Sequence, residues 1–561
     1  MPHLRPCYRS VGARCSAARL ALPLAALLAS GVSAAVGVEA VWVGVADTMV
    51  KIPREPAAVG SLGAEALAAI RWGGTLRLEL ARGELESAQL VLAAPADRAL
   101  ADVRVSVGPL LRRRAGGDVP WPTEDIRLWR VGFVDAHNLW EPHQSLGWLP
   151  DPLLPLQTAF DIPAGTLQPV WLRFRAAEAL PPGLYRGEVT VEARGADPVR
   201  VPLRVTVWDF TLPPTQHFTL SIPVWGGQWE AMYPGAVTAE RRREYLDMLL
   251  QYRVSPFPLD PEAELEHCFG RGQRAFCLHC FPVDSVPPDT TERMADLQEM
   301  WLRRPFAPEA TPYVLLGDEA SPVHYPNIQE QGRLVRGAAP LLQRLFTLSP
   351  ENTTKGHDYA FSELAGSADT TILGAANCYD VHRHTELARA AGLGVWWYYV
   401  ASHYYIPGRG LEVRQVFWRH WKYRVPGQLH WGASYWGDGN IAGQGGARWP
   451  EIPWDSRCSR AGDGYLVYPA PDGTEMWPSV RLELLRDGVE DYEYFHLLRT
   501  LLETAPADEE LLTESRRLLA LDDGLVESYS EYSTRPGAYR SYRARLARAI
   551  VNVQAVGAAP R

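Results

Sequence analysis

The alternation of strand-like and helix-like segments after residue 217 constrains the fold of this chain more than any other feature. Apolar runs at 218–225 and 394–400 have the character of buried strands, whereas 238–252 repeats its apolar residues with the period of a helix. Such alternation predicts a parallel sheet, and a (β/α)8 TIM-like barrel is its simplest closed form. A doubly wound open sheet is the alternative, although no glycine-rich phosphate fingerprint follows any of these strands.

Further elements of this region follow from the same periodicities. The segment 226–312 is too irregular for its strands to be counted. A long helix over 481–503 and two or more helices within 508–555 close the structure, and we interpret the Arg-rich second half of that region as a solvated face. The remaining predicted strands are 313–316, 370–376, 428–436 and 464–468, and the remaining predicted helices are 291–303, 327–345, 384–391 and 413–423.

The region 41–211 has a different pattern, in which short strands are broken by Gly and Pro. Because no long helical pattern intervenes, we predict an antiparallel β-sandwich of about eight strands. The Leu212-Pro-Pro-Thr215 linker then marks the boundary to the barrel. The predicted divisions are a signal peptide over 1–35, the N-terminal sandwich over 36–213, the barrel over 214–500 and a C-terminal helical segment over 501–561.

The first 35 residues have the layout of a secretory signal peptide. Four arginines precede the apolar run 20–29, and small residues follow at 33–35, which predicts cleavage near Ala34 or Ala35. An uncleaved anchor is the alternative, but the apolar run is short for a bilayer. We therefore expect a secreted or periplasmic protein without stable membrane insertion. The net charge of -9 gives no reason to expect a nucleic-acid partner.

Cleavage at this site would leave five cysteines. Cys268, Cys277 and Cys280 lie close together with His267, a set of residue types that also suits zinc. Because an exported protein meets an oxidising compartment, a disulfide between Cys268 and either Cys277 or Cys280 is the favoured interpretation, with free thiols and a metal site as alternatives. The odd count leaves at least one thiol unpaired. The other two cysteines are Cys378 and Cys458.

Two adjacent acids follow the predicted strand 313–316. Gly317 ends the apolar run, and Asp318 and Glu319 come directly after it. In an α/β barrel this position faces the mouth of the active site. Neighbouring residues of a regular strand point to opposite faces, so the two acids share one pocket only if the strand breaks at Gly317. The alternative is a solvated acidic turn that caps the next helix.

Polar and aromatic residues also follow three further strands of the predicted barrel. Twenty Trp and 23 Tyr suit carbohydrate binding as well as a large core. Because alternate residues of a barrel strand belong to its core, we expect about half of the aromatic residues at these strand ends to contact a ligand. The two aspartates among them could equally cap helices or turns. The candidate substrate-binding residues are Asn377, Asp380, Trp397, Tyr399, His403, Tyr435, Trp436 and Asp438.

The acid pair favours glycoside hydrolysis without a metal or cofactor. No nucleophile, zinc-protease or phosphate-loop motif is present in the sequence. Adjacent acids are poorly placed to flank a glycosidic bond from opposite sides. They suit a substrate-assisted reaction, in which a 2-acetamido oxygen attacks the anomeric carbon and one acid holds the amide N–H. The other acid protonates the leaving oxygen, so we expect its pKa to be raised by burial or by its neighbour.

Three motifs resemble those of glycoside hydrolase family 123. They are ELESAQLVL at 84–92, Leu-Gly-Asp-Glu at 316–319 and RLELLRDGVEDYEY at 481–494, so the resemblance covers most of the chain. We interpret the last motif as structural, with charges that tie the final helix to the barrel through ion pairs. The sequence departs from the family at Ala320, where relatives commonly have Pro, and in the cysteine-bearing run 267–280.

This resemblance implies a β-N-acetylgalactosaminidase-type enzyme. Glu319 would be the acid/base, and Asp318 would orient and polarise the acetamido group. The implied substrate is a glycan, either an oligosaccharide or a glycolipid headgroup, that ends in a β-linked N-acetylhexosamine. Two alternatives remain: a two-carboxylate glycosidase that pairs Glu319 with Asp380 or Asp438, and a non-catalytic carbohydrate-binding or surface protein that keeps the barrel.

Overall fold

The computed structural model describes most of the chain after residue 40, and all of these residues belong to one unit, Ala40–Arg561. The predicted signal peptide lies outside the described residues. The described ranges are 41–55, 61–136, 146–224, 226–348, 357–374, 381–398, 404–436, 454–456, 461–504 and 509–558.

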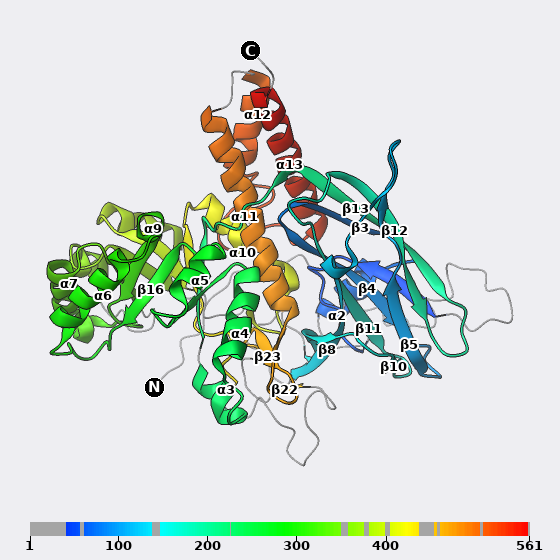
Figure 1. Cartoon of the computed structure of the whole chain (residues 1–561), viewed down its shortest axis with the longest axis horizontal. Coiled ribbons are helices and arrows are strands. Elements are labelled where there is room, and N and C mark those ends of the chain that lie inside the picture. Colours follow the sequence, from blue (N-terminus) through cyan, green and yellow to red (C-terminus); the bar gives the residue numbers. More distant parts are fainter. Residues whose placement is uncertain are drawn as a thin grey trace, which may run out of the picture. The chain divides into compact units, whose positions relative to one another are not determined.

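Two largely antiparallel sheets form the N-terminal part of the described chain (Figure 1). Short helix α2 (Ser61–Ala69) follows the first strand. The first sheet contains β2 (Arg71–Trp72), β1 (Trp42–Ala46), β4 (Leu85–Ala93), β11 (Leu167–Arg175), β8 (Ile126–Ala136), β9 (Gly147–Pro155) and β22 (Trp454–Ser456). The second contains β10 (Phe160–Ile162), β5 (Leu100–Val107), β12 (Gly183–Glu192), β13 (Val199–Thr211), β3 (Leu76–Arg82), β6 (Leu111–Arg112) and β7 (Val119–Pro120).

Apolar and polar residues alternate along strands of these sheets, as predicted. Along β13 buried and more exposed residues alternate, so that Val201, Leu203 and Val205 enter a core shared with residues of β4 and β11. Two pairings differ from a purely antiparallel sandwich. Strand β3 pairs with β13 in parallel, and β22 pairs in parallel with β8 although it lies more than 300 residues later in the chain.

Eight parallel strands form a nearly closed barrel in the second part of the chain. Every recorded pairing among them is parallel, and the sheet opens only between its two end strands, β15 and β16. The eight strands are β14 (Thr219–Pro223), β15 (Val254–Phe257), β16 (Ala275–Cys280), β17 (Thr311–Leu315), β18 (Gln343–Leu348), β19 (Thr370–Gly374), β20 (Gly394–Tyr398) and β21 (Gly427–Leu429).

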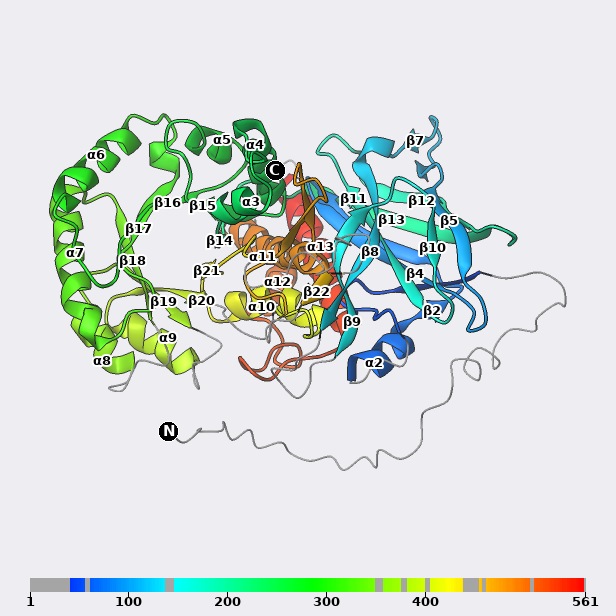
Figure 2. The same ribbon diagram turned by 90° about the horizontal axis from the view of Figure 1, so that it is seen from below.

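Helices follow the barrel strands and surround them (Figure 2). Thr238 caps α4 by accepting a hydrogen bond from the backbone of Arg241, as its sequence predicts. None of the helices in the described part of the chain has the length and apolar character needed to cross a bilayer. The helices are α3 (Gly226–Met232), α4 (Ala239–Gln251), α5 (Leu265–Gly270), α6 (Thr290–Leu302), α7 (Tyr325–Ala338), α8 (His357–Leu364), α9 (Val381–Ala390), α10 (Gly410–Lys422), α11 (Val480–Thr504), α12 (Glu509–Ala520) and α13 (Pro536–Ala558).

Two sequence predictions need correction, and the segment whose strands could not be counted is now defined. The helix predicted over 327–345 ends at Ala338, because Pro340 cannot continue it, and strand β18 begins at Gln343. The irregular segment 226–312 contains two barrel strands, β15 and β16. The strand predicted over 464–468 is not part of the barrel. It overlaps β23 (Val467–Pro469), which pairs antiparallel with β24 (Met476–Pro478).

Helix α11 contacts both the N-terminal sheets and the barrel through buried polar groups. On this helix Arg481 forms an ion pair of 2.7 Å with Asp151 of β9, and neither side chain is exposed to solvent. Ser87 of β4 donates to Glu483 at 3.0 Å. The motifs 84–92 and 481–494 are therefore in direct contact. The predicted structural role of 481–494 is confirmed, with the addition that it also engages the sheets.

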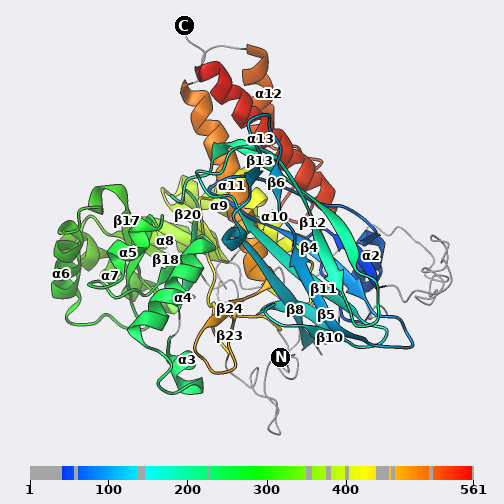
Figure 3. The same ribbon diagram turned by 45° about the vertical axis from the view of Figure 1, so that its right-hand side comes forward.

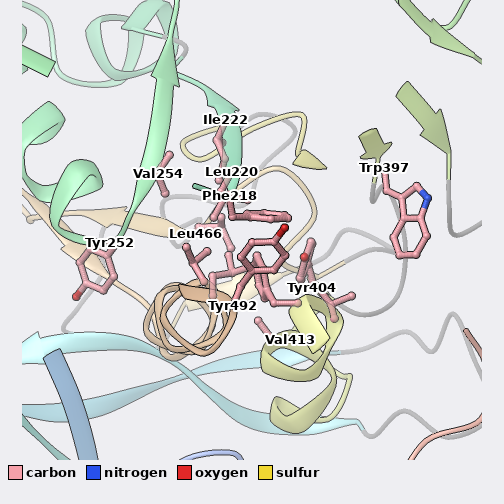
Figure 4. Packing of buried hydrophobic residues seen from close by; sticks show 14 of the residues in the cluster. Phe218, Leu220, Ile222, Tyr252, Val254, Trp397, Tyr404, Val413, Leu466 and Tyr492 are labelled. Carbon is pink, nitrogen blue, oxygen red and sulfur yellow. The ribbon is translucent and has the colours of Figure 1, made fainter. Parts of the chain in front are cut away.

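The C-terminal helices pack beside α11 (Figure 3). The Arg-rich face of this region is not wholly solvated, which corrects the prediction. Arg543 of α13 is buried, and its guanidinium bonds Glu84 and lies 2.6 Å from Asp491 of α11. On the barrel side, the Phe218 ring is tilted against that of Tyr492, with centroids 5.0 Å apart, within one continuous apolar core (Figure 4). Buried charges and aromatic rings thus hold α11 in place.

Candidate active site

The acid pair lies directly after β17, at the carboxyl end of the barrel. Leu316 and Gly317 leave the strand, and Asp318 and Glu319 are exposed to solvent. Glu319 has a φ of 46°, a left-handed conformation that non-glycine residues seldom adopt. Such a residue costs roughly 1–3 kcal/mol, and residues of this kind cluster at active sites and ligand clamps. The regular alternation of the strand therefore ends at this pair, as a shared pocket for both acids requires.

Thr347 of β18 fixes the loop that carries the acids. Its hydroxyl donates to Asp318 Oδ1 at 2.6 Å and accepts the backbone N–H of Glu319 at 2.5 Å. The backbone N–H of Ala320 donates to the Thr347 carbonyl at 3.0 Å. A proline at position 320 could not form this bond, since it has no N–H. The departure from the family pattern at Ala320 thus provides an additional anchor for the loop.

Tyr398, the last residue of β20, is affected by the charges of the acids. It is almost completely buried, and burial is the main reason that its pKa is raised above the ordinary value. The negative charges of Asp318, Glu319 and Asp463 raise this pKa further. Since such effects need proximity, the adjacent acids and the distant Asp463 all act on one phenol.

Asp463 in turn contacts an aromatic pair. Trp431 donates its indole N–H to Asp463 Oδ1 at 2.7 Å, and its ring lies 5.0 Å from that of Tyr435. Gly464 makes room for the indole, because a Cβ there would come within 2.3 Å of the Trp431 ring, and its φ of 74° also favours glycine.

Trp431 and Tyr435 border a cavity of about 610 Å³ at the ends of β14, β15 and β21. Its lining is mainly apolar, which suits the apolar face of a sugar ring. The acids do not line this cavity themselves. Val224, Gly227, Gln228, Arg242, Pro258, Trp431 and Tyr435 line the cavity.

The structure brings some of the predicted site residues to this mouth and leaves others elsewhere. Asp318, Glu319 and Tyr435 belong to it. Trp397 does not, because alternation along β20 directs it to the helix layer, where it donates to Thr385 at 3.2 Å (Figure 4). Trp436 is also buried, with its indole N–H bonded to the Val467 carbonyl at 2.9 Å. Asn377, Asp380, Tyr399, His403 and Asp438 lie outside the described residues.

Sequence reasoning did not select Thr347, Tyr398, Trp431 or Asp463 as site residues. Tyr398 could have been predicted, because alternation along β20 places its side chain on the opposite face of the strand from Trp397, in the barrel interior. Thr347 could not be found because the predicted helix 327–345 covers the start of its strand, β18. We find no sequence signal that marks Asp463.

The predicted disulfide is absent, since Cys268, Cys277 and Cys280 are free cysteines. Neighbouring residues of β16 point to opposite sides, so Phe276 packs with Cys268 outside the barrel whereas Cys277 belongs to the barrel interior. The strand thus separates Cys268 from Cys277. Cys378 and Cys458 lie outside the described residues.

One group of metal-ligand type occurs within the described ranges, at the opposite end of the barrel from the acids. It consists of His217, Glu493 and His496, whose ligand atoms lie within 4.8 Å of one another. The two imidazoles are stacked, with centroids 3.8 Å apart and planes 12° apart. Their lone pairs therefore lie in two nearly parallel planes that are set apart, so one ion could not lie in the planes of both rings. This arrangement does not suit metal binding.

Comparisons with known proteins support the fold and a glycosidase. Residues 339–498 match the family model described as "Glycoside hydrolase 123, catalytic domain", a range that begins after the acid pair. The solved structure of a family 123 glycoside hydrolase from Clostridium perfringens, described as acting in glycolipid glycan hydrolysis, has a TM-score of 0.63. The two chains are 14% identical over 91% of this chain and 98% of that one. No curated protein is significantly similar to this chain.

Two further solved structures resemble the chain much less. A Bacteroides ovatus GH5 xyloglucanase has a TM-score of 0.27 at 9% identity, covering 74% of this chain and 98% of that one. A Parabacteroides merdae β-glucuronidase has a TM-score of 0.25 at 9% identity, covering 70% and 47% of the two chains. TM-scores this low do not indicate a shared overall fold. Residues 339–498 thus match a family 123 catalytic domain, which indicates a glycosidase, and the chain shares its fold with the Clostridium perfringens enzyme.

Proposed function

We propose that this glycosidase releases a terminal β-linked N-acetylhexosamine, with N-acetylgalactosamine as the preferred sugar, by a retaining, substrate-assisted reaction. The observation that carries the proposal is the adjacent pair Asp318 and Glu319, set side by side where the backbone of Glu319 is left-handed. Export through the N-terminal signal peptide is part of the same proposal. So is the division into a supporting sandwich and a catalytic (β/α)8 barrel.

Each acid has a distinct role in this reaction. Asp318, oriented by the Thr347 hydroxyl, accepts the N–H of the 2-acetamido group and directs its oxygen at the anomeric carbon. Glu319 protonates the departing glycosidic oxygen and later deprotonates the water that opens the cyclic intermediate. Because both acids are exposed without a ligand, the substrate itself must exclude water from them. The Trp431 and Tyr435 rings provide an apolar surface for the glycan.

The decisive test is dependence on the 2-acetamido group. Wild-type protein should hydrolyse an aryl β-N-acetylgalactosaminide and should leave the matching 2-hydroxyl galactoside intact. Asp318→Asn should slow the first reaction by roughly 10²-fold, the size expected when a group that stabilises developing charge is removed. Equal rates on the two sugars would instead favour a two-carboxylate glycosidase, for which Asp463 offers a further carboxylate beside Tyr398. Binding of the glycan without turnover would favour a carbohydrate-binding protein.

Thr347 provides a separate test of how the acids are positioned. Thr347→Val keeps the shape of the side chain but removes its bonds to Asp318 and to the Glu319 backbone. A hydrogen bond to a charged group contributes about 1.5–3 kcal/mol, so we expect kcat/KM for the N-acetylgalactosaminide to fall roughly 10- to 10²-fold. Thr347→Ser keeps the hydroxyl and is the matched control. Equal activity of the two variants would show that this hydroxyl does not position the acids.

A further inference from the structure

Cys277 and Cys280 form a pair of thiols at the end of β16, beside the strand that carries the acids. Their Sγ atoms are 3.7 Å apart. Residues three apart in a regular strand point to opposite faces. Here the register with β17 shifts between Cys277 and His279, so the strand contains one extra residue at Leu278. This bulge brings the two thiols to the same side of the strand.

The two thiols differ in exposure and acidity. Cys277 lies in the barrel interior, and burial raises its pKa well above the ordinary value. Cys280 is exposed by surface area, and the hydrogen bond from Cys277 is the main reason that its pKa is lowered, against partial desolvation and the charge of Asp318, which both raise it. An accessible, more acidic thiol next to a buried partner is the arrangement in which one sulfur attacks an oxidant and the other resolves the product.

We propose that Cys277 and Cys280 form a reversible dithiol–disulfide site whose oxidant is a low-molecular-weight disulfide. The Cys280 thiolate attacks one sulfur of the small disulfide, so that its S–S bond breaks, a mixed disulfide forms and one thiolate leaves and takes up a proton. Cys277 then attacks the Cys280 sulfur, and its proton passes to the second departing thiolate. The two cysteines lose two electrons and two protons, and the small disulfide becomes two thiols.

Formation of this disulfide should displace residues that contact the loop of the acid pair. The sulfurs must approach from 3.7 Å to the bonded distance of about 2.05 Å, which displaces the end of β16. The next residue, Phe281, donates its backbone N–H to Leu315 of β17 at 2.8 Å. Val283 lies against Gly317, where an added Cβ would be only 3.0 Å from its methyl group. This contact is immediately before Asp318, so oxidation should misplace the acids and slow hydrolysis.

The dithiol site can be tested without any assay of activity. The full chain is equilibrated with graded ratios of reduced and oxidised glutathione, alkylated, and digested with trypsin. Cys277 and Cys280 then share the fragment 275–293, which contains no other cysteine, while Cys268 lies on the fragment 254–271. We expect an internal disulfide in 275–293 whose fraction follows the glutathione ratio, while Cys268 stays alkylated. Full alkylation of 275–293, or only glutathione adducts on it, would overturn the proposal.

The predicted effect of the disulfide on hydrolysis rests on the proposed function. It is measured separately, as the rate of hydrolysis by the oxidised and the reduced protein. Oxidised wild-type protein should hydrolyse the N-acetylgalactosaminide more slowly, by a factor of the order of ten, and should recover with dithiothreitol. Cys280→Ser should give the same rate in both buffers, and Cys268→Ala should respond as wild type does. A disulfide without any change in rate would refute the coupling to the acids. Absence of hydrolysis in both buffers would refute the proposed function and leave the fragment result valid.

Discussion

Glu319→Gln is expected to lower kcat/KM on an N-acetylgalactosamine glycan by roughly 10²- to 10⁴-fold, the usual contribution of general acid–base catalysis. Glutamine keeps the size of the side chain but cannot donate a proton to the glycosidic oxygen. An aryl glycoside with a good leaving group needs little protonation, so its hydrolysis should fall much less. The loss of activity on each substrate is measured by release of sugar. A larger loss on the glycan than on the aryl glycoside is the result expected if Glu319 donates the proton.

Glu309→Gln is a matched control, because Glu309 is an exposed acid just before the same strand. It should hydrolyse both substrates at the wild-type rate. If Glu319→Gln kept wild-type activity on the natural glycan, Glu319 would not be the proton donor.

Arg481→Met is expected to lower the free energy of unfolding by about 3–5 kcal/mol, the cost of leaving one charge of a buried ion pair without its partner. The guanidinium donates to Asp151 through two nitrogens, at 2.8 and 2.7 Å. It also bonds the carbonyls of Tyr404, Gly462 and Tyr465, each at 2.7 Å. Methionine fills much of the volume but removes all five of these hydrogen bonds and leaves Asp151, among the described residues, only the one from the Tyr468 hydroxyl.

Urea denaturation of the variant and of Arg516→Met measures this difference. Arg516 is mostly exposed and lies 3.8 Å from an exposed glutamate, so its replacement should change the free energy of unfolding by less than about 0.5 kcal/mol. Similar unfolding free energies for the two variants would show that the Arg481 pair does not hold α11 between the sheets and the barrel.

The periodic parts of the fold could be predicted because local pattern and tertiary structure agree there. Alternation along β13 and strand–helix alternation after residue 217 both correspond to observed elements. The prediction failed where a short strand had no pattern of its own. Strands β15 and β16 have only four and six residues, and β18 follows a helix so closely that the two were read as one.

The site was predicted in part for a similar physical reason. Asp318 and Glu319 could be selected because strand, glycine and acids are consecutive in sequence. Thr347 and Asp463 could not be predicted, because only folding brings Thr347 to the acids and Asp463 to the aromatic pair. The cysteines show the same limit. Closeness in sequence suggested a bond from Cys268, but the two faces of β16 separate it from Cys277.

A crystal structure with an N-acetylgalactosamine-derived thiazoline, a stable mimic of the cyclic intermediate, tests the central claim most directly. The bound sugar should lie at the mouth near Trp431, with Asp318 within hydrogen-bond distance of the thiazoline nitrogen and Glu319 beside the anomeric carbon. A thiazoline bound away from both acids, or bound here with Asp318 turned from its nitrogen, would contradict substrate-assisted hydrolysis by this pair.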